Sequence, residues 1–161
     1  MRVPKTLLLL AAAALTVALS SCTRLNSRPP ASILSVSGFG KGKGTMAVTF
    51  VLGDASGAMT TADGTARVTV FELEKVWAPL AGVWTDRKVP VFTTVVEVHR
   101  RDFAEVRDPV DTGRPETILY SLGLLHYDQF DRRPTEPRGL VEVAFHTADG
   151  RILKGSDQFN F

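Results

Sequence analysis

The segment over residues 140–161, LVEVAFHTADGRILKGSDQFNF, decides the fold class of this 161-residue chain. Apolar and polar residues alternate over 140–147, the chain then reaches Asp149-Gly150, and a second strand-like segment follows over 151–161. An Asp-Gly pair between two alternating segments is the strongest short-range signal for a β-hairpin, because its tight turn needs positive φ angles. The C-terminal segment therefore predicts two antiparallel strands.

Strand signals continue through the rest of the chain. They lie at 45–52, 65–73, 90–98 and 118–127, with turn clusters at 53–57 and 61–64. The segment 118–127 also fits a helical stripe. About six to eight short strands with no long helix predict an all-β fold, a single antiparallel β-sandwich, with a small β-barrel as the alternative. This architecture is similar to immunoglobulin-like and fibronectin-III-like domains, and the similarity carries no functional residues.

The N-terminal region has the organisation of an export signal. Arg2 and Lys5 precede a predominantly apolar stretch over 7–19, which is shorter than the roughly 20 residues of a membrane-spanning helix. The order Leu19-Ser20-Ser21-Cys22 then resembles the lipobox of bacterial lipoprotein precursors. This resemblance implies cleavage before Cys22 and attachment of diacylglycerol to its thiol; an ordinary secretory signal with a chance cysteine is the alternative.

A lipidated Cys22 would place the protein in the cell envelope, held at a membrane by its acyl chains. Two or more chains make such anchoring stable, whereas a single chain holds a protein only marginally. Thr23 follows the cysteine where inner-membrane lipoproteins of the family carry Asp. The resemblance therefore favours the outer membrane if the host has one.

The expected cleavage divides the chain into a signal peptide over 1–21, a lipidated cysteine with a flexible tether over 22–44, and a β-sandwich over 45–161. The tether includes the glycine-rich stretch 38–44, GFGKGKG, which is a flexible continuation or an irregular edge strand and lacks the spacing of a phosphate-binding loop. Removing residues 1–21 leaves 17 Lys and Arg against 17 Asp and Glu. This neutral balance gives no indication of nucleic-acid binding.

Several kinds of catalytic site are excluded by the sequence. Cys22 is the only cysteine, so the domain has no thiol nucleophile and no cysteine-based metal cluster. The hydrolase motifs GxSxG, HExxH and SxxK are absent, and the pair Arg132-Arg133 is expected to be solvated surface. One enzymatic alternative remains, a carboxylate-dependent hydrolase using paired acids. Its candidates are Glu72 and Glu74 on one strand face, and Asp102, Glu105, Asp108 and Asp111 in a loop.

The three histidines, His99, His126 and His146, support a second alternative. Each lies near the end of a predicted strand, and three neighbouring strands could bring the imidazoles together as zinc or copper ligands. No pair has the close spacing of a metal-binding motif. The histidines are therefore weak candidates for a periplasmic metal- or small-ligand-binding domain, and the sequence predicts no cofactor.

Residues 76–84, VWAPLAGVW, contain both tryptophans of the chain and no charge. Exposed side chains of Trp77, Leu80 and Trp84 could contact a protein partner, a glycan or a lipid surface. The sequence favours a different interpretation, in which both rings cap the sandwich core, because large apolar patches rarely stay exposed. We expect a non-enzymatic binding or assembly module of the envelope, with the membrane and an envelope protein as its partners.

Overall fold

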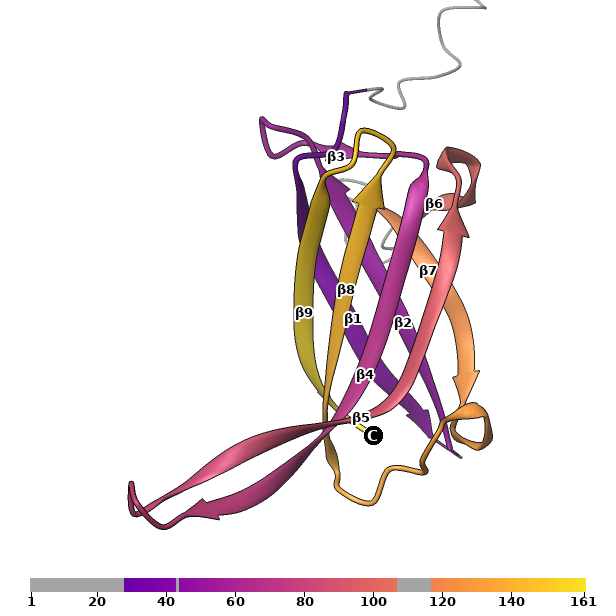
Figure 1. The fold of residues 1–161 in the computed structure, drawn as a ribbon. Helices are drawn as coiled ribbons and strands as arrows, with labels where there is room; N and C mark the ends of the chain where they lie inside the picture. The colour runs from indigo at the N-terminus through magenta and orange to yellow at the C-terminus, as the bar shows by residue number, and fades with distance from the viewer. Residues whose placement is uncertain (1–27, 43, 107–116) are drawn as a thin grey trace, which may run out of the picture.

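The computed structural model describes residues 28–42, 44–106 and 117–161, which form two antiparallel sheets packed face to face (Figure 1). The first sheet has the order β1 (Ser32–Gly42), β2 (Thr45–Gly53), β7 (Thr117–His126), β6 (Phe103–Val106), and β3 (Met59–Thr60) pairs with β2. The second has the order β5 (Val83–Val98), β4 (Gly64–Ala78), β8 (Arg138–Thr147), β9 (Ile152–Asn160). Two short 3-10 helices, η1 (Arg100–Asp102) and η2 (Tyr127–Gln129), follow β5 and β7.

This arrangement confirms the predicted all-β sandwich. Within the residues that the structure describes, no strand of one sheet pairs with a strand of the other, so the fold is not a closed barrel. The helical alternative for 118–127 is wrong, because this segment is strand β7. In the same part of the chain, no helix is long and apolar enough to cross a membrane.

The core lies between the two sheets and follows from the alternation of the strands. On β4, Ala66, Val68 and Val70 have no exposed surface, while residues between them face outward. Across the interior, the ring of Phe50 from β2 lies 6.0 Å from the ring of Phe145 on β8. Burial of each large apolar side chain contributes about 1.5–3 kcal/mol, so these contacts hold the two sheets together.

The predicted C-terminal hairpin is confirmed. Strands β8 and β9 are antiparallel neighbours, and Gly150 has a φ of 85° in the turn between them. The backbone N–H of Gly150 donates to the carbonyl of Thr147 at 3.0 Å. Phe159 on β9 is buried against the core, which ties the C-terminal strand to the sandwich.

The N-terminal boundary of the sandwich differs from the expected tether over 22–44. Ser32–Gly42 is strand β1, and the chain is already bonded to the body at Arg28. The carbonyl of Arg28 accepts a hydrogen bond from the Thr60 hydroxyl at 2.7 Å, and its guanidinium lies 3.5 Å from the carboxylate of buried Asp54. Residues 38–42 of the glycine-rich stretch therefore belong to an irregular edge strand, the second of the two interpretations.

The glycines of this strand allow β1 and β9 to lie side by side. A Cβ atom on Gly38 would lie 2.9 Å from the ring of Phe159, and one on Gly155 would lie 2.8 Å from Val36. The N–H of Gly38 donates instead to the carboxylate of Asp157 on β9 at 3.1 Å. We call this contact the β1–β9 seam; it brings the edges of the two sheets together through a side chain rather than a strand ladder.

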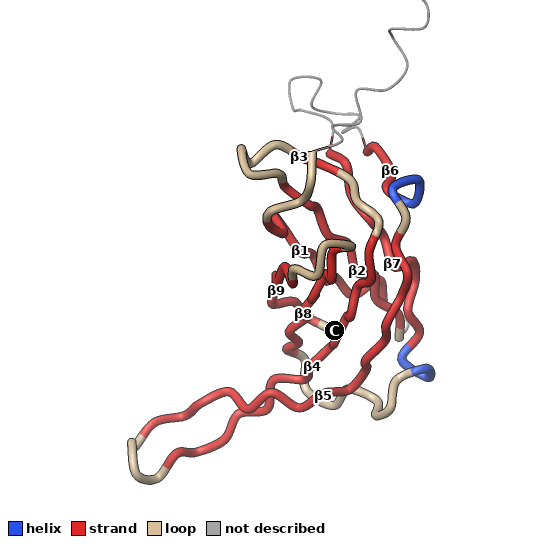
Figure 2. The backbone as a smooth tube through the Cα atoms, turned by 45° about the horizontal axis from the view of Figure 1, so that its top comes forward, coloured by secondary structure: helices blue, strands red, loops and turns tan. Residues whose placement is uncertain are grey.

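Strands β4 and β5 continue far beyond the sandwich as a two-stranded arm, which Figures 1 and 2 show projecting from one end. Pairing of β4 with β8 ends at Glu72, which lies opposite Gly139. Residues 73–78 and 83–88 then pair only with each other. The predicted strands over 65–73 and 90–98 were thus too short at the ends that form the arm.

Candidate functional site

The far end of the arm is a tight turn flanked by the two tryptophans. The backbone N–H groups of Ala81 and Gly82 donate to the carbonyl of Ala78 at 3.1 and 2.9 Å, and Gly82 has a φ of 64° that favours glycine. Trp77 and Trp84 are directly opposite each other in the strand register. Their ring centroids are 5.6 Å apart in an edge-to-face arrangement.

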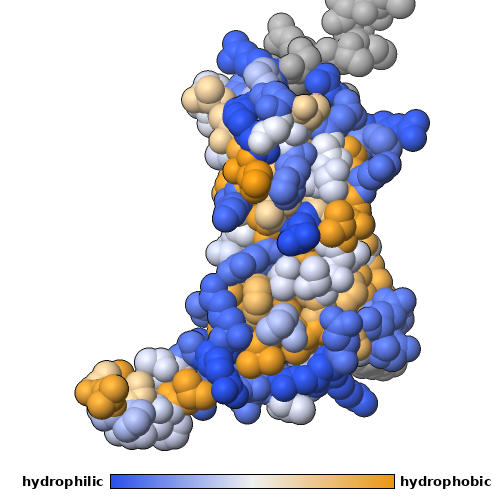
Figure 3. All heavy atoms as spheres, in the orientation of Figure 1, coloured by the Kyte–Doolittle hydropathy of each residue, from blue (hydrophilic) through white to orange (hydrophobic). Residues whose placement is uncertain are grey.

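The side chains at this end are exposed. Trp77 is 50% and Trp84 62% exposed, Val83 is half exposed, and Leu80 at the apex is fully exposed. Residues 76–85 carry no charge, and Figure 3 shows apolar surface at the end of the arm. We call Trp77, Leu80, Val83 and Trp84 the apolar tip. The favoured expectation that the tryptophans cap the core is therefore wrong, because the arm carries them away from both sheets.

A buried carboxylate lies where the arm leaves the body. The alternation that buries Ala66, Val68 and Val70 also places Glu72 inward, with no exposed surface. One of its oxygens accepts hydrogen bonds from the N–H and hydroxyl of Thr135 at 2.6 and 2.8 Å and from the N–H of Glu136. The other oxygen binds the guanidinium of Arg132.

These contacts keep Glu72 ionised inside the protein. Burial alone would raise the pKa of its carboxyl group. The N–H of Glu136, the Arg132 guanidinium and Thr135 outweigh this effect, and together they lower the pKa of Glu72 to about 2. Glu72 thus fastens β4 to the connection between β7 and β8, which contains its partners.

Further ion pairs surround this carboxylate on the arm. Glu74 accepts from Arg87 across the arm and from Arg132 at 3.0 Å, and these two guanidinium groups lower the pKa of Glu74. Asp86 binds both terminal nitrogens of Arg138 at 3.0 and 2.9 Å. We call this set of charged contacts, including Glu72, the ionic root. It links both strands of the arm to β8 and to the loop before it.

The ionic root corrects two expectations about these residues. Arg132 was expected to be solvated surface, but it bridges Glu72 and Glu74. The two glutamates, the proposed acid pair of a hydrolase, are thus bound to the same guanidinium rather than turned toward a substrate. The signal for Glu72 was present in the period-two pattern of β4, which assigns position 72 to the core face.

The structure does not bring the three histidines together. His99 and His146 lie at the end of the second sheet where Gly64 is aligned with Val98 and Thr147. His126 is the last residue of β7, opposite Thr45, and β7 ends at the other end of the sandwich (Figure 1). Among residues 28–42, 44–106 and 117–161, no group of three or more His, Cys, Asp or Glu side chains could hold a metal ion.

The remaining candidate residues do not form a common site in the described structure. Asp102 accepts a hydrogen bond from the N–H of His99 at 2.8 Å, which stabilises the turn after β5. Glu105 is on β6, while Asp108 and Asp111 lie outside the described residues, as does Cys22.

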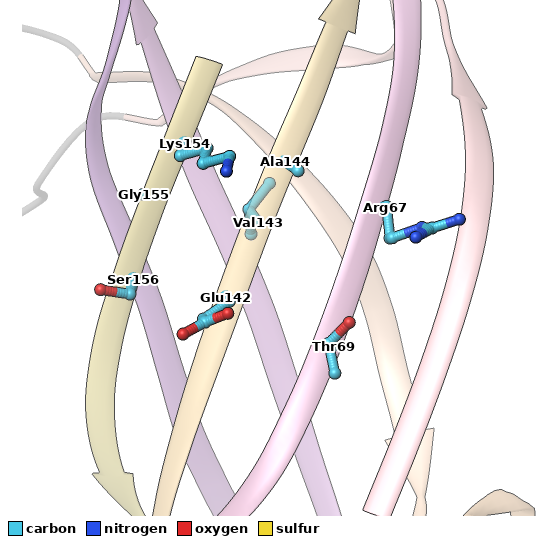
Figure 4. Close-up of a pocket in the computed structure, with 8 residues that line it drawn as sticks. All are labelled: Arg67, Thr69, Glu142, Val143, Ala144, Lys154, Gly155 and Ser156. Atoms are coloured by element: carbon cyan, nitrogen blue, oxygen red, sulfur yellow. The ribbon is translucent and has the colours of Figure 1, made fainter. Parts of the chain in front are cut away.

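A shallow groove crosses the outer face of β4, β8 and β9 (Figure 4). Its lining includes Arg67, Glu142 and Lys154, one from each strand. Figure 4 shows Arg67 extending toward β5, away from Lys154, and Glu142 pairs with Lys88 at 2.6 Å. The charged groups therefore do not converge on one point, and the groove is the solvated face of the sheet.

Comparison of the chain with protein-family models, with curated proteins and with solved structures finds no match. The apolar tip and the ionic root therefore define the candidate site by their own geometry.

Proposed function

We propose that this protein is a lipoprotein of the cell envelope, anchored by Cys22, and that it acts as a non-enzymatic binding or assembly module. The observation that carries the proposal is the apolar tip, which is presented on an arm away from the body. Tryptophan is among the residues that contribute most to binding when they become buried at an interface. An exposed apolar cluster of this kind marks a contact surface.

The ionic root supports this function because it holds the arm in place before any contact is made. A two-stranded hairpin by itself is only marginally stable in water. Here Arg132 fastens Glu72 and Glu74 to the loop before β8, and Arg138 fastens Asp86 to β8 itself. A pre-ordered arm loses less conformational entropy on binding than a flexible one.

The engagement of Glu72 and Glu74 by Arg132 also favours binding over carboxylate-dependent hydrolysis. A glycosidase needs two carboxyl groups on either side of a substrate, one of them able to donate a proton. Glu72 has a pKa of about 2 and contacts Thr135 and Arg132 from the protein itself. It is unsuited to that acid role.

The proposal is tested by site-specific photo-crosslinking in cells that produce the full precursor. A photoreactive residue at position 80 is compared with one at position 154, where exposed Lys154 lies on the body. We expect adducts with an envelope component from position 80 only, and mass spectrometry should find acyl chains on Cys22. Equal labelling from both positions would remove the tip as the contact surface, and an unmodified Cys22 would remove the anchor.

A further inference from the structure

We propose that the apolar tip docks into the headgroup region of the lipid bilayer, in the same leaflet that holds the Cys22 lipid. The protein is then attached to one membrane at two points, by its acyl chains and by the arm. The choice of leaflet rests on the proposed lipid anchor, and the inference names the partner of the contact surface proposed above.

The chemistry of the apolar tip fits a lipid surface. Tryptophan rings concentrate at membrane–water interfaces, where the indole N–H stays hydrated and the ring contacts acyl chains. Leu80, at the apex of the turn that joins the two tryptophan-bearing strands, is fully exposed. A glycan would need polar side chains to bind its hydroxyl groups, yet the hydroxyl of Thr85 already donates to the carbonyl of Val76 at 3.4 Å.

The size of the apolar tip also favours lipid over a protein partner. Two half-exposed tryptophans with Leu80 and Val83 present roughly 500 Å² of apolar surface. A standard protein–protein interface buries about 800 Å² on each partner and needs a complementary shape. A fluid headgroup layer accommodates a small convex tip without any complementary shape.

Charged residues behind the apolar tip limit how deeply it can enter. Lys75 lies opposite Asp86, and Glu74 lies opposite Arg87, immediately behind the uncharged residues 76–85. Both outer edges of the arm also carry backbone groups that hydrocarbon cannot satisfy. About three residues of each strand lie in front of these charges, or roughly 10 Å, which matches the depth of an interfacial contact.

The lengths of the tether and the arm allow both attachments to the same leaflet. Because Arg28 is bonded to the body, the chain between the proposed lipid on Cys22 and the body is only six residues long, and it spans at most about 20 Å. Beyond Glu72 the arm has six residues in each strand, which also extend about 20 Å. Arg28 is bonded to Thr60 of β3, and Figures 1 and 2 show the arm leaving the end of the sandwich opposite β3 and bending away from the sandwich strands. A sandwich lying on its side thus brings the lipid and the tip to one surface.

The chain supplies its own probe for this contact, because Trp77 and Trp84 are its only tryptophans. The purified lipoprotein is reconstituted through its lipid into phosphatidylethanolamine–phosphatidylglycerol vesicles, with and without brominated acyl chains. We expect tryptophan fluorescence to be quenched by brominated lipid and shielded from aqueous iodide. Leu80→Asp should abolish the bromine quenching. The control Val95→Asp adds the same charge at a 55% exposed position of β5 within the body, and should leave it intact.

Each outcome decides the proposal. The proposal would be overturned if, in a sample whose Cys22 is lipidated, iodide quenches the tryptophan fluorescence and brominated lipid does not. That result would indicate a protein or glycan partner. Quenching only by brominated vesicles added separately would overturn the placement in the same leaflet. If mass spectrometry finds Cys22 unmodified, the anchor fails, and excess brominated vesicles still decide whether the tip enters lipid.

Discussion

Replacing Glu72 with glutamine should destabilise the folded chain by about 3 kcal/mol at neutral pH. Glutamine preserves the shape of the side chain but removes the charge that Arg132 and the N–H of Glu136 stabilise. A folded-state pKa of about 2 against an ordinary value of 4.5 corresponds to this free energy. It also agrees with the roughly 3–5 kcal/mol lost when one partner of a buried ion pair is removed.

The pH dependence gives this prediction its sign. A carboxyl group whose pKa is lowered on folding stabilises the folded state above its ordinary pKa, and this contribution disappears as the pH falls through the folded value. The difference in stability between the native chain and Glu72→Gln should therefore be full at pH 7, decrease below about pH 5, and vanish near pH 2. Asp54 and Asp149 also have lowered pKa values, but they are common to both proteins and cancel in the difference.

Urea denaturation followed by far-ultraviolet circular dichroism measures these free energies. Tryptophan fluorescence is unsuitable, because both rings lie on the apolar tip and do not report on the core. Glu74→Gln is the matched control, since Glu74 also binds Arg132 but is partly exposed, and it should lose less stability. A Glu72→Gln chain as stable as the native one at pH 7, or a difference that stays constant down to pH 3, would refute this account of the ionic root.

Two further changes test the fold and the independence of the arm. Gly64→Ala should destabilise the sandwich by about 2 kcal/mol or more in the same urea titration, because a Cβ there would lie 2.6 Å from the ring of Phe145 and also meet the carbonyl of His146. Replacing residues 76–85 with Asn-Gly joins Lys75 to Asp86, which are already opposite each other, through a favoured two-residue turn, and it keeps the contact of Asp86 with Arg138. This shortened chain should melt within a few degrees of the native one, since the deleted segment packs against neither sheet; a large drop would show that the arm supports the core.

Much of the sandwich could be predicted from the sequence, because burial on one face leaves a period-two pattern. Residues 45–52 correspond closely to β2, and the Asp149-Gly150 turn joins β8 to β9. Strand β1 was harder to recognise, since glycine gives no alternating apolar signal. Its glycines are needed because β9 lies close to β1. Since β9 is distant in the sequence, this requirement leaves no local pattern around β1.

The candidate site was less predictable from the sequence, because it is formed by a segment that packs against neither sheet. An apolar segment such as 76–84 could either cover a core or project from it. Only the sheet pairing shows that β4 loses its neighbour β8 after Glu72, so that the following residues form a free arm. Arg132 was ambiguous for a related reason. Its role depends on Glu72, 60 residues earlier in the chain, and a charge pattern cannot reveal a partner at that distance.

The β1–β9 seam has a consequence for how copies of this protein would meet at the membrane proposed above. Proteins confined to a surface collide in two dimensions, where exposed strand edges of neighbouring copies would add to one another and aggregate. In this chain the edges of β1 and β9 face each other, and the carboxylate of Asp157 accepts a hydrogen bond from the N–H of Gly38. On the other side of the sandwich, β6 is short and the carbonyl of Val91 on β5 already accepts from Asp131. The seam thus removes β1 and β9 as places where neighbouring copies could add strand to strand, and the long open edges among the described strands are those of β5 and of the arm.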